Sequence, residues 1–218
     1  MADQPTVVVR GEALREVPPE QAVFAVTVSA RGKDQQAVLT RLTERAAELR
    51  PILDGYSDAI ERRETGGMQV YPELKRGRES VSAYTGSFST TVTVTDFTVL
   101  GELLLRLAGQ ELTAVAGPWW QLRPGSTAGA EVRREAIADA LGRAREYADA
   151  VGAQVDRLIE ISDEGVGGAG DRGMMRSMAF GGSRGAADAL ELELDPQQQT
   201  VQASVVVRVA VTEPTALK

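Results

Sequence analysis

The 218-residue chain contains no cysteine and no histidine, and lysine occurs only at positions 33, 75 and 218. Without cysteine there is no disulfide and no thiol nucleophile, and without histidine there is no imidazole base and no Ser-His-Asp triad. Zinc sites of the usual kinds also need one of these two residue types. We therefore expect a protein that is not an enzyme, with no catalytic residue, no bound metal and no cofactor.

Long hydrophobic runs and basic stretches are also missing. No apolar run approaches the roughly 20 residues that a membrane helix needs, so no membrane span is expected. The start, MADQPTVVVRG, has neither the basic nor the apolar region of a signal peptide, which as written predicts a cytoplasmic protein. The net charge is -7, and nucleic acid binders need a basic face to neutralise phosphates. We therefore expect no nucleic acid partner.

What the chain does contain is an ordinary globular composition, 43% hydrophobic and 25% charged, with clear periodic patterns. Alternation, helical spacing and turn residues predict ten elements in the order ββαββαβαββ. Strands are expected at 6–14, 21–30, 60–71, 81–95, 112–123, 155–162 and 200–211, and helices at 35–50, 97–108 and 126–151. Because hairpins outnumber βαβ crossovers, the pattern favours an α+β fold, a largely antiparallel sheet with three main helices in one domain over 1–218.

Several local features sharpen this prediction. Both faces of the strand at 21–30 are fairly apolar, which favours a central position in the sheet. Pro51 should end or kink the first helix, and Gly66-Gly67 suggests a bulge in the strand at 60–71. In the third helix small side chains recur every four residues, which would let it pack closely on a sheet: Val132, Ala136, Ala140, Ala144 and Ala148.

Short motifs along nearly the whole chain resemble those of the SIMPL-domain family. They are VVVRGEALREVPPEQA (with Gly11, Pro19, Glu20 and Ala22), GGMQVYPEL (with Tyr71 and Pro72), Tyr84, DFTVLGELL, EVRREAIADALGRAREYADAVG and DPQQQTVQASVVVRVAV with Pro196. The chain departs from the family pattern in having Glu20 where Asp is commoner and Gln197 where Gly is frequent. The resemblance implies an α+β domain that tends to self-assemble. It also implies bacterial relatives that are often periplasmic or envelope-associated, some of them linked to stress defence, and it carries over no catalytic residues.

The segment GVGGAG spells G-x-G-x-x-G with Gly165, Gly167 and Gly170, the spacing of a dinucleotide-binding turn. Such a turn must open a helix, but the following DRGMMRSMAFGG has no helical stripe of useful length. The glycine content instead predicts a flexible excursion over 165–195, since ordering such a segment costs much entropy. Its end, 186–195, fits either a short helix or an edge strand.

Interaction residues are predicted in two places. The excursion carries adaptable methionines with an aromatic and basic residues, which suit contacts with a partner: Met174, Met175, Met178, Phe180, Arg172 and Arg176. Trp119 and Trp120 are adjacent in a strand, so one indole should face the core and the other the surface. The carboxylates near the excursion are better explained as a solvated strand edge than as a metal site: Glu160, Asp163, Glu164, Glu191, Glu193 and Asp195.

Two functions follow from these patterns. The first is a non-enzymatic SIMPL-domain protein, stress- or envelope-related, that acts by self-assembly as a homo-oligomer or by binding an unidentified protein partner. The alternative is a small-molecule module that binds an anionic ligand, with the loop at 165–185 as a lid.

Overall fold

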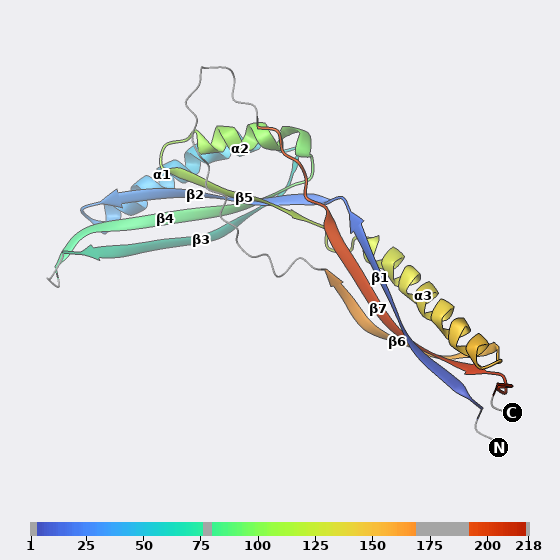
Figure 1. Cartoon of the computed structure of the whole chain (residues 1–218). Coiled ribbons are helices and arrows are strands. Elements are labelled where there is room, and N and C mark those ends of the chain that lie inside the picture. Colours follow the sequence, from blue (N-terminus) through green and yellow to red (C-terminus); the bar gives the residue numbers. More distant parts are fainter. Residues whose placement is uncertain (1–3, 76–79, 169–191, 217–218) are drawn as a thin grey trace, which may run out of the picture. The chain divides into compact units, whose positions relative to one another are not determined.

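The computed structural model describes residues 4–75, 80–168 and 192–216. Its helices and strands follow the predicted order ββαββαβαββ, and the α+β class with antiparallel sheets is confirmed (Figure 1). The elements are β1 (Thr6–Val17), β2 (Gln21–Gly32), α1 (Gln35–Asp54), β3 (Ile60–Leu74), β4 (Val81–Val94), the 3₁₀ turn η1 (Phe97–Val99), α2 (Leu100–Ala108), β5 (Thr113–Gln121), α3 (Ala128–Ala150), β6 (Val155–Gly168) and β7 (Gln199–Val211).

The chain divides into two compact units, each with its own sheet and core. The first unit takes the described parts of 1–18, 122–177 and 198–218, and the second takes those of 19–121 and 178–197. The second unit is therefore inserted between segments of the first. The expectation that residues 1–218 act as a single domain stays a prediction.

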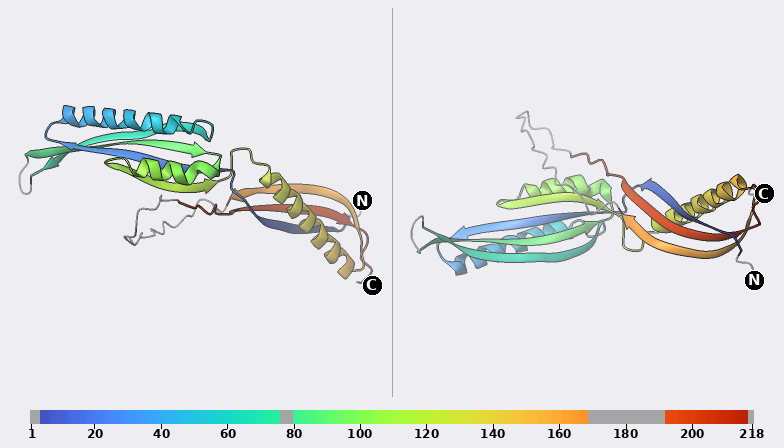
Figure 2. Two further views of the ribbon diagram at one scale, coloured as in Figure 1. Left: turned by 90° about the horizontal axis from the view of Figure 1, so that it is seen from above. Right: turned by 60° about the horizontal axis from the view of Figure 1, so that its bottom comes forward.

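The first unit is a three-stranded antiparallel sheet in the order β1-β7-β6, with α3 on one face (Figure 2). The alternate residues of β7 from Val201 to Val211 face the helix and are buried. The alanine stripe of α3 packs against them, as its four-residue spacing predicts. The helix lies so close to Gly11 of β1 that an added Cβ there would be 2.1 Å from the carbonyl oxygen of Ala136. Only a residue without a side chain fits there.

The second unit is a four-stranded antiparallel sheet in the order β3-β4-β2-β5, with α1 and α2 on the same face (Figure 1). The predicted central position of β2 is confirmed, because β2 pairs with β4 on one side and with β5 on the other. Its alternate residues Phe24, Val26 and Val28 are fully buried beneath the helices. Asp34 caps α1 by accepting a hydrogen bond from the Ala37 amide at 2.8 Å.

Details of the second unit test two of the local predictions. The register of β3 and β4 shifts between Thr65 and Gly67, so the predicted bulge is confirmed. Pro51 was predicted to end or kink α1, and it does not end the helix, which continues to Asp54; the kink stays a prediction. Proline costs one backbone hydrogen bond in a helix, and the last turn is retained because Leu53 within it is buried in the core.

The segment after Ser162 also differs from the prediction. The excursion was expected to begin at residue 165, but β6 extends to Gly168, and Gly167 pairs with Gln202 of β7. The first two glycines of the G-x-G-x-x-G pattern therefore belong to a strand, and the second of them, Gly167, pairs directly with β7. Residues 169–191 lie outside the described residues, and 192–198 have no regular secondary structure.

Candidate functional site

The tryptophan pair lies near the end of β5, an edge strand of the second unit. Trp120 faces the helices and packs edge-on against Phe97, with ring centroids 4.9 Å apart and planes at 80°. Trp119 lies on the opposite, helix-free face and is 47% exposed. The alternation of a strand thus places one indole in the core and the other at the surface, as the sequence predicts. Whether Trp119 and Trp120 take part in an interaction stays a prediction.

The edge strand β6 of the first unit carries three exposed aliphatic side chains close together in the sequence. Leu158, Ile159 and Ile161 are 51%, 45% and 43% exposed. Leu158 and Ile161 lie opposite Val209 and Val207, and so on the face of the sheet that carries α3. Because α3 packs mainly on β1 and β7, it leaves these side chains uncovered. We call Leu158, Ile159 and Ile161 the β6 edge patch.

The carboxylates near β6 are engaged with other residues. Glu160 lies 3.7 Å from Arg208 of β7 and accepts a hydrogen bond from the Ser162 hydroxyl at 3.1 Å. Glu193 and Asp195 are exposed on the irregular segment. In the parts of the chain that the structure describes, no group of three or more Asp or Glu side chains could hold a metal ion. The Glu164 side chain and Glu191 fall outside those parts.

Most of the predicted excursion lies outside the residues that the structure describes. Its interaction residues Met174, Met175, Met178, Phe180, Arg172 and Arg176 all lie outside the described residues. Beyond them, Leu192 and Leu194 pack against the core of the second unit. The Leu192 carbonyl lies so near Gly101 of α2 that a Cβ there would approach it to 2.1 Å. The end of the excursion is thus held against α2, a contact that the sequence did not suggest.

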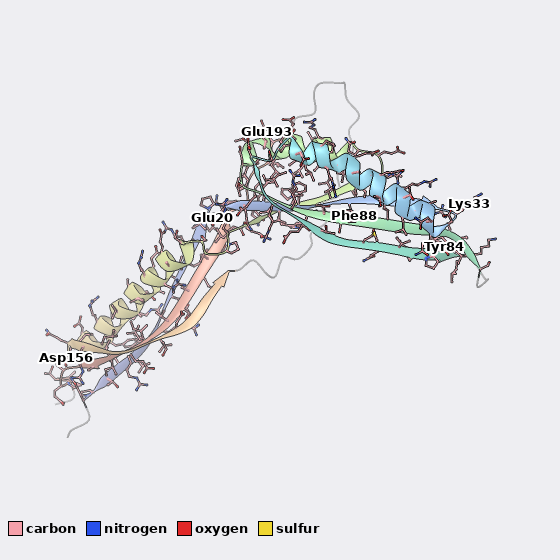
Figure 3. All side chains as sticks on the ribbon, turned by 180° about the vertical axis from the view of Figure 1, so that it is seen from behind. Glu20, Lys33, Tyr84, Phe88, Asp156 and Glu193 are labelled. Carbon is pink, nitrogen blue, oxygen red and sulfur yellow. The ribbon has the colours of Figure 1, made fainter. Side chains whose placement is uncertain are left out.

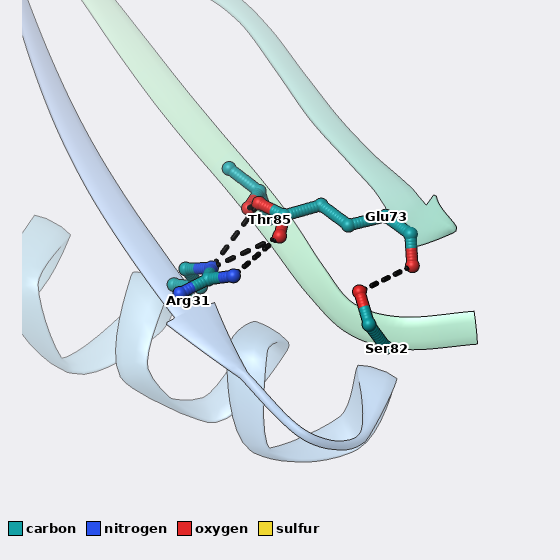
Figure 4. Close-up of polar contacts among 4 residues, drawn as sticks. All are labelled: Arg31, Glu73, Ser82 and Thr85. Atoms are coloured by element: carbon teal, nitrogen blue, oxygen red, sulfur yellow. Dashed lines mark hydrogen bonds and ion pairs between the residues drawn. The ribbon is translucent and has the colours of Figure 1, made fainter. Parts of the chain in front are cut away.

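The best-defined polar cluster lies on the helix-free face of the second unit (Figure 4). Arg31 of β2 reaches across β4 to Glu73 of β3, and its Nη2 donates to Glu73 Oε2 at 2.6 Å. The Thr85 hydroxyl of β4 donates to Glu73 Oε1 at 2.5 Å, and Ser82 Oγ donates to the Glu73 carbonyl at 2.9 Å. These bonds tie three strands together at one end of the sheet.

The Arg31 guanidinium, followed by the Thr85 hydroxyl, lowers the pKa of the Glu73 carboxyl below its ordinary value of 4.5. Because this pKa is lower in the folded state, the contribution of Glu73 to stability is present above pH 4.5 and is lost as the pH falls through the folded value.

Replacing Arg31 with glutamine should raise the pH at which Glu73 titrates, measured by ¹³C NMR of its carboxyl carbon. The matched control is Arg62→Gln, since Arg62 pairs with Glu64 of the same sheet. An unchanged Glu73 midpoint in Arg31→Gln would contradict the assignment.

The geometry therefore defines a class of protein: an α+β protein of two sheet-and-helix units, with polar clusters that tie strands together and exposed apolar residues at strand edges. Comparison of the sequence with known families narrows this class. The model of the SIMPL family, described as a protein of unknown function (DUF541), matches residues 7–209. The chain belongs to this family, which confirms the resemblance seen in its motifs.

Two curated relatives are similar to the chain. They are the 26 kDa periplasmic immunogenic proteins of Brucella melitensis biotype 1 and Brucella abortus strain S19. Each is 28% identical over 187 residues, which cover 75% of this chain and 68% of the relative. In the described ranges no helix has the length and apolar character needed to cross a membrane. The named relatives are periplasmic, so they lend no support to the cytoplasmic prediction.

Proposed function

We propose that the protein is a non-enzymatic SIMPL-domain protein of the cell envelope that acts by self-association through the β6 edge of its first unit. The observation that carries the proposal is the β6 edge patch, three exposed aliphatic side chains on a strand that pairs on one side only. A long edge strand with exposed apolar residues is a template for pairing with another chain. The periplasmic names of the two Brucella relatives support the choice of compartment.

A second copy of the chain is the simplest partner for this edge. Two β6 strands that pair antiparallel place the same residues on both sides of a two-fold axis, which gives a closed contact between identical surfaces. Such pairing satisfies the free backbone groups of both edges and brings the two β6 edge patches together. An unidentified protein with its own open strand could use the same edge.

Light scattering on the full chain tests the proposal. The wild-type protein should have a mass that is a multiple of 23.3 kDa. The double variant Leu158→Lys/Ile161→Lys should be monomeric, because two ammonium groups would have to be desolvated in the contact. The control is Tyr147→Lys, which replaces an exposed side chain on α3 and should keep the wild-type mass. A monomeric wild type, or an assembled double variant with a native circular dichroism spectrum, would refute the proposal.

The alternative function is a module that binds an anionic ligand, with residues 165–185 as its lid. Gly165–Gly168 belong to β6, and the rest of the lid lies outside the described residues. The structure therefore supplies no observation that favours a lid.

A further inference from the structure

A groove of about 400 Å³ runs between α1 and the adjoining strands β3 and β4. It lies wholly within the second unit. One side of α1 provides Ala46, Leu49 and Leu53, and β4 provides Phe88, labelled in Figure 3 on the strand beneath this helix. These four side chains give the groove an apolar floor. The volume is within the range of about 300–1,000 Å³ that is typical of small-molecule sites.

The charged residues along the rim are mostly paired with one another. Arg63 Nη1 lies 2.5 Å from Asp54 Oδ1, and its Nη2 donates to the Leu53 carbonyl at 2.5 Å. Glu64 Oε2 lies 3.2 Å from Nε of Arg62. Both carboxylates that line the groove therefore already have a cationic partner. These pairs leave no net charge on that part of the rim.

Arg50 is the exception on this rim. Arg50 is exposed, and its side chain makes no hydrogen bond or ion pair with any residue that the structure describes. Arginine presents a planar fork of donors that matches a carboxylate. Because Asp54 pairs with Arg63 and Glu64 pairs with Arg62, which lies outside the lining, Arg50 is left beside the apolar floor as a charged lining residue with no counter-charge among the described residues. This charge distribution is complementary to a monoanion with an apolar tail.

Two hydroxyl groups add polar capacity to the same groove. Thr65 of β3 and Thr90 of β4 lie opposite each other in the strand register, and both line the groove. Neither hydroxyl has a hydrogen-bond partner among the described residues. Each can donate to an anionic oxygen or to a water bound with it. The groove therefore combines a free guanidinium, two free hydroxyls and an apolar floor.

We propose that this groove binds a small aliphatic monocarboxylate. The carboxylate would pair with Arg50, and the aliphatic chain would lie along Leu49, Leu53 and Phe88. Binding would exclude water from the apolar floor and would compensate the charge of Arg50. The site goes beyond the proposed self-association, because it uses α1, β3 and β4 and none of the β6 edge patch.

Calorimetric titration of the full chain with sodium octanoate tests this site. Saturable binding is expected, and Arg50→Gln should weaken it by about tenfold or more, since a charged hydrogen bond is worth roughly 1.5–3 kcal/mol. The matched control is Arg134→Gln, which removes an exposed arginine from α3 and should bind octanoate as the wild type does. Acetate, which lacks the chain, and 1-octanol, which lacks the charge, should both bind more weakly than octanoate.

A second variant tests the floor of the groove separately. Ala46→Leu places a larger apolar side chain in the groove and should abolish octanoate binding while Arg50 is unchanged. The proposal is overturned if octanoate does not bind the wild type saturably, if Arg50→Gln or Ala46→Leu binds it normally, or if Arg134→Gln weakens it as much as Arg50→Gln. Equal binding of octanoate and 1-octanol would also overturn it. All of these outcomes are independent of the mass measured by light scattering.

Discussion

Replacing Gly11 with alanine is expected to lower the free energy of unfolding by about 3 kcal/mol, the upper part of the usual range for overpacking a core. The new Cβ would lie 2.1 Å from the carbonyl oxygen of Ala136 and 2.5 Å from the amide nitrogen of Ala140. Both are backbone atoms of α3, so no side-chain rotation relieves the clash and the helix must move off β1. Urea denaturation followed by circular dichroism measures the loss, and hydrogen exchange should show reduced protection in β1, β7 and α3.

The same substitution at Gly142 is the matched control and has the opposite expected sign. Gly142 also belongs to the first unit, in the middle of α3, and an added Cβ there would meet no atom within 4 Å. Alanine lowers the conformational entropy of the unfolded chain and is the better helix former, so Gly142→Ala should stabilise the protein by about 1 kcal/mol. If Gly11→Ala were as stable as Gly142→Ala, the close packing of α3 on β1 would be contradicted.

Truncation of Phe24 to alanine should cost about 3–5 kcal/mol of stability. Phe24 is the largest fully buried side chain among the described residues and lies on the central strand β2, in the core that α1 and α2 cover. Its removal leaves a cavity bounded by strands and helices that can close only in part. Denaturant titration gives the change in stability, and hydrogen exchange should show the loss of protection in β2, β4 and α1.

Thr27 provides the comparison for this prediction. It lies three residues further along β2, on the helix-free face, and is only partly buried. Thr27→Ala should therefore cost about 1 kcal/mol or less, mainly through the lower strand preference of alanine. Similar losses for Phe24→Ala and Thr27→Ala would mean that the helices do not cover the face of β2 that carries Phe24.

Periodic patterns in the sequence were sufficient to predict the elements of the fold. The apolar residues on both faces of 21–30 identified β2 as central, and the four-residue spacing of alanines identified the buried stripe of α3. These patterns are local, because they depend on the repeat of a helix or strand. The requirement for glycine at position 11 is not local, because Gly11 lies against residues of α3 that are more than 120 positions away in the sequence. No property of the neighbouring sequence shows that α3 lies against β1 at that point.

The candidate sites were less predictable than the fold. Strand alternation separated Trp119 from Trp120, but it could not show that β6 is an edge strand left largely uncovered by α3. Leu158, Ile159 and Ile161 have the composition of buried residues, and only the sheet order and the position of the helix leave them exposed. The groove beside Arg50 is similar, because its lining comes from a helix and two strands that are distant in sequence.

The order of the strands in the first unit has a consequence for synthesis of the chain. β1 is complete at Val17, but β7, with which it pairs and which is the central strand of that sheet, begins at Gln199. At about 5–20 residues per second, β1 must wait on the order of ten seconds or more for that partner to leave the ribosome. During this interval the β-branched run Thr6–Val9 is an unpaired strand that other nascent chains can join. Efficient production of the protein therefore depends on protecting its first strand until its last strand has been made.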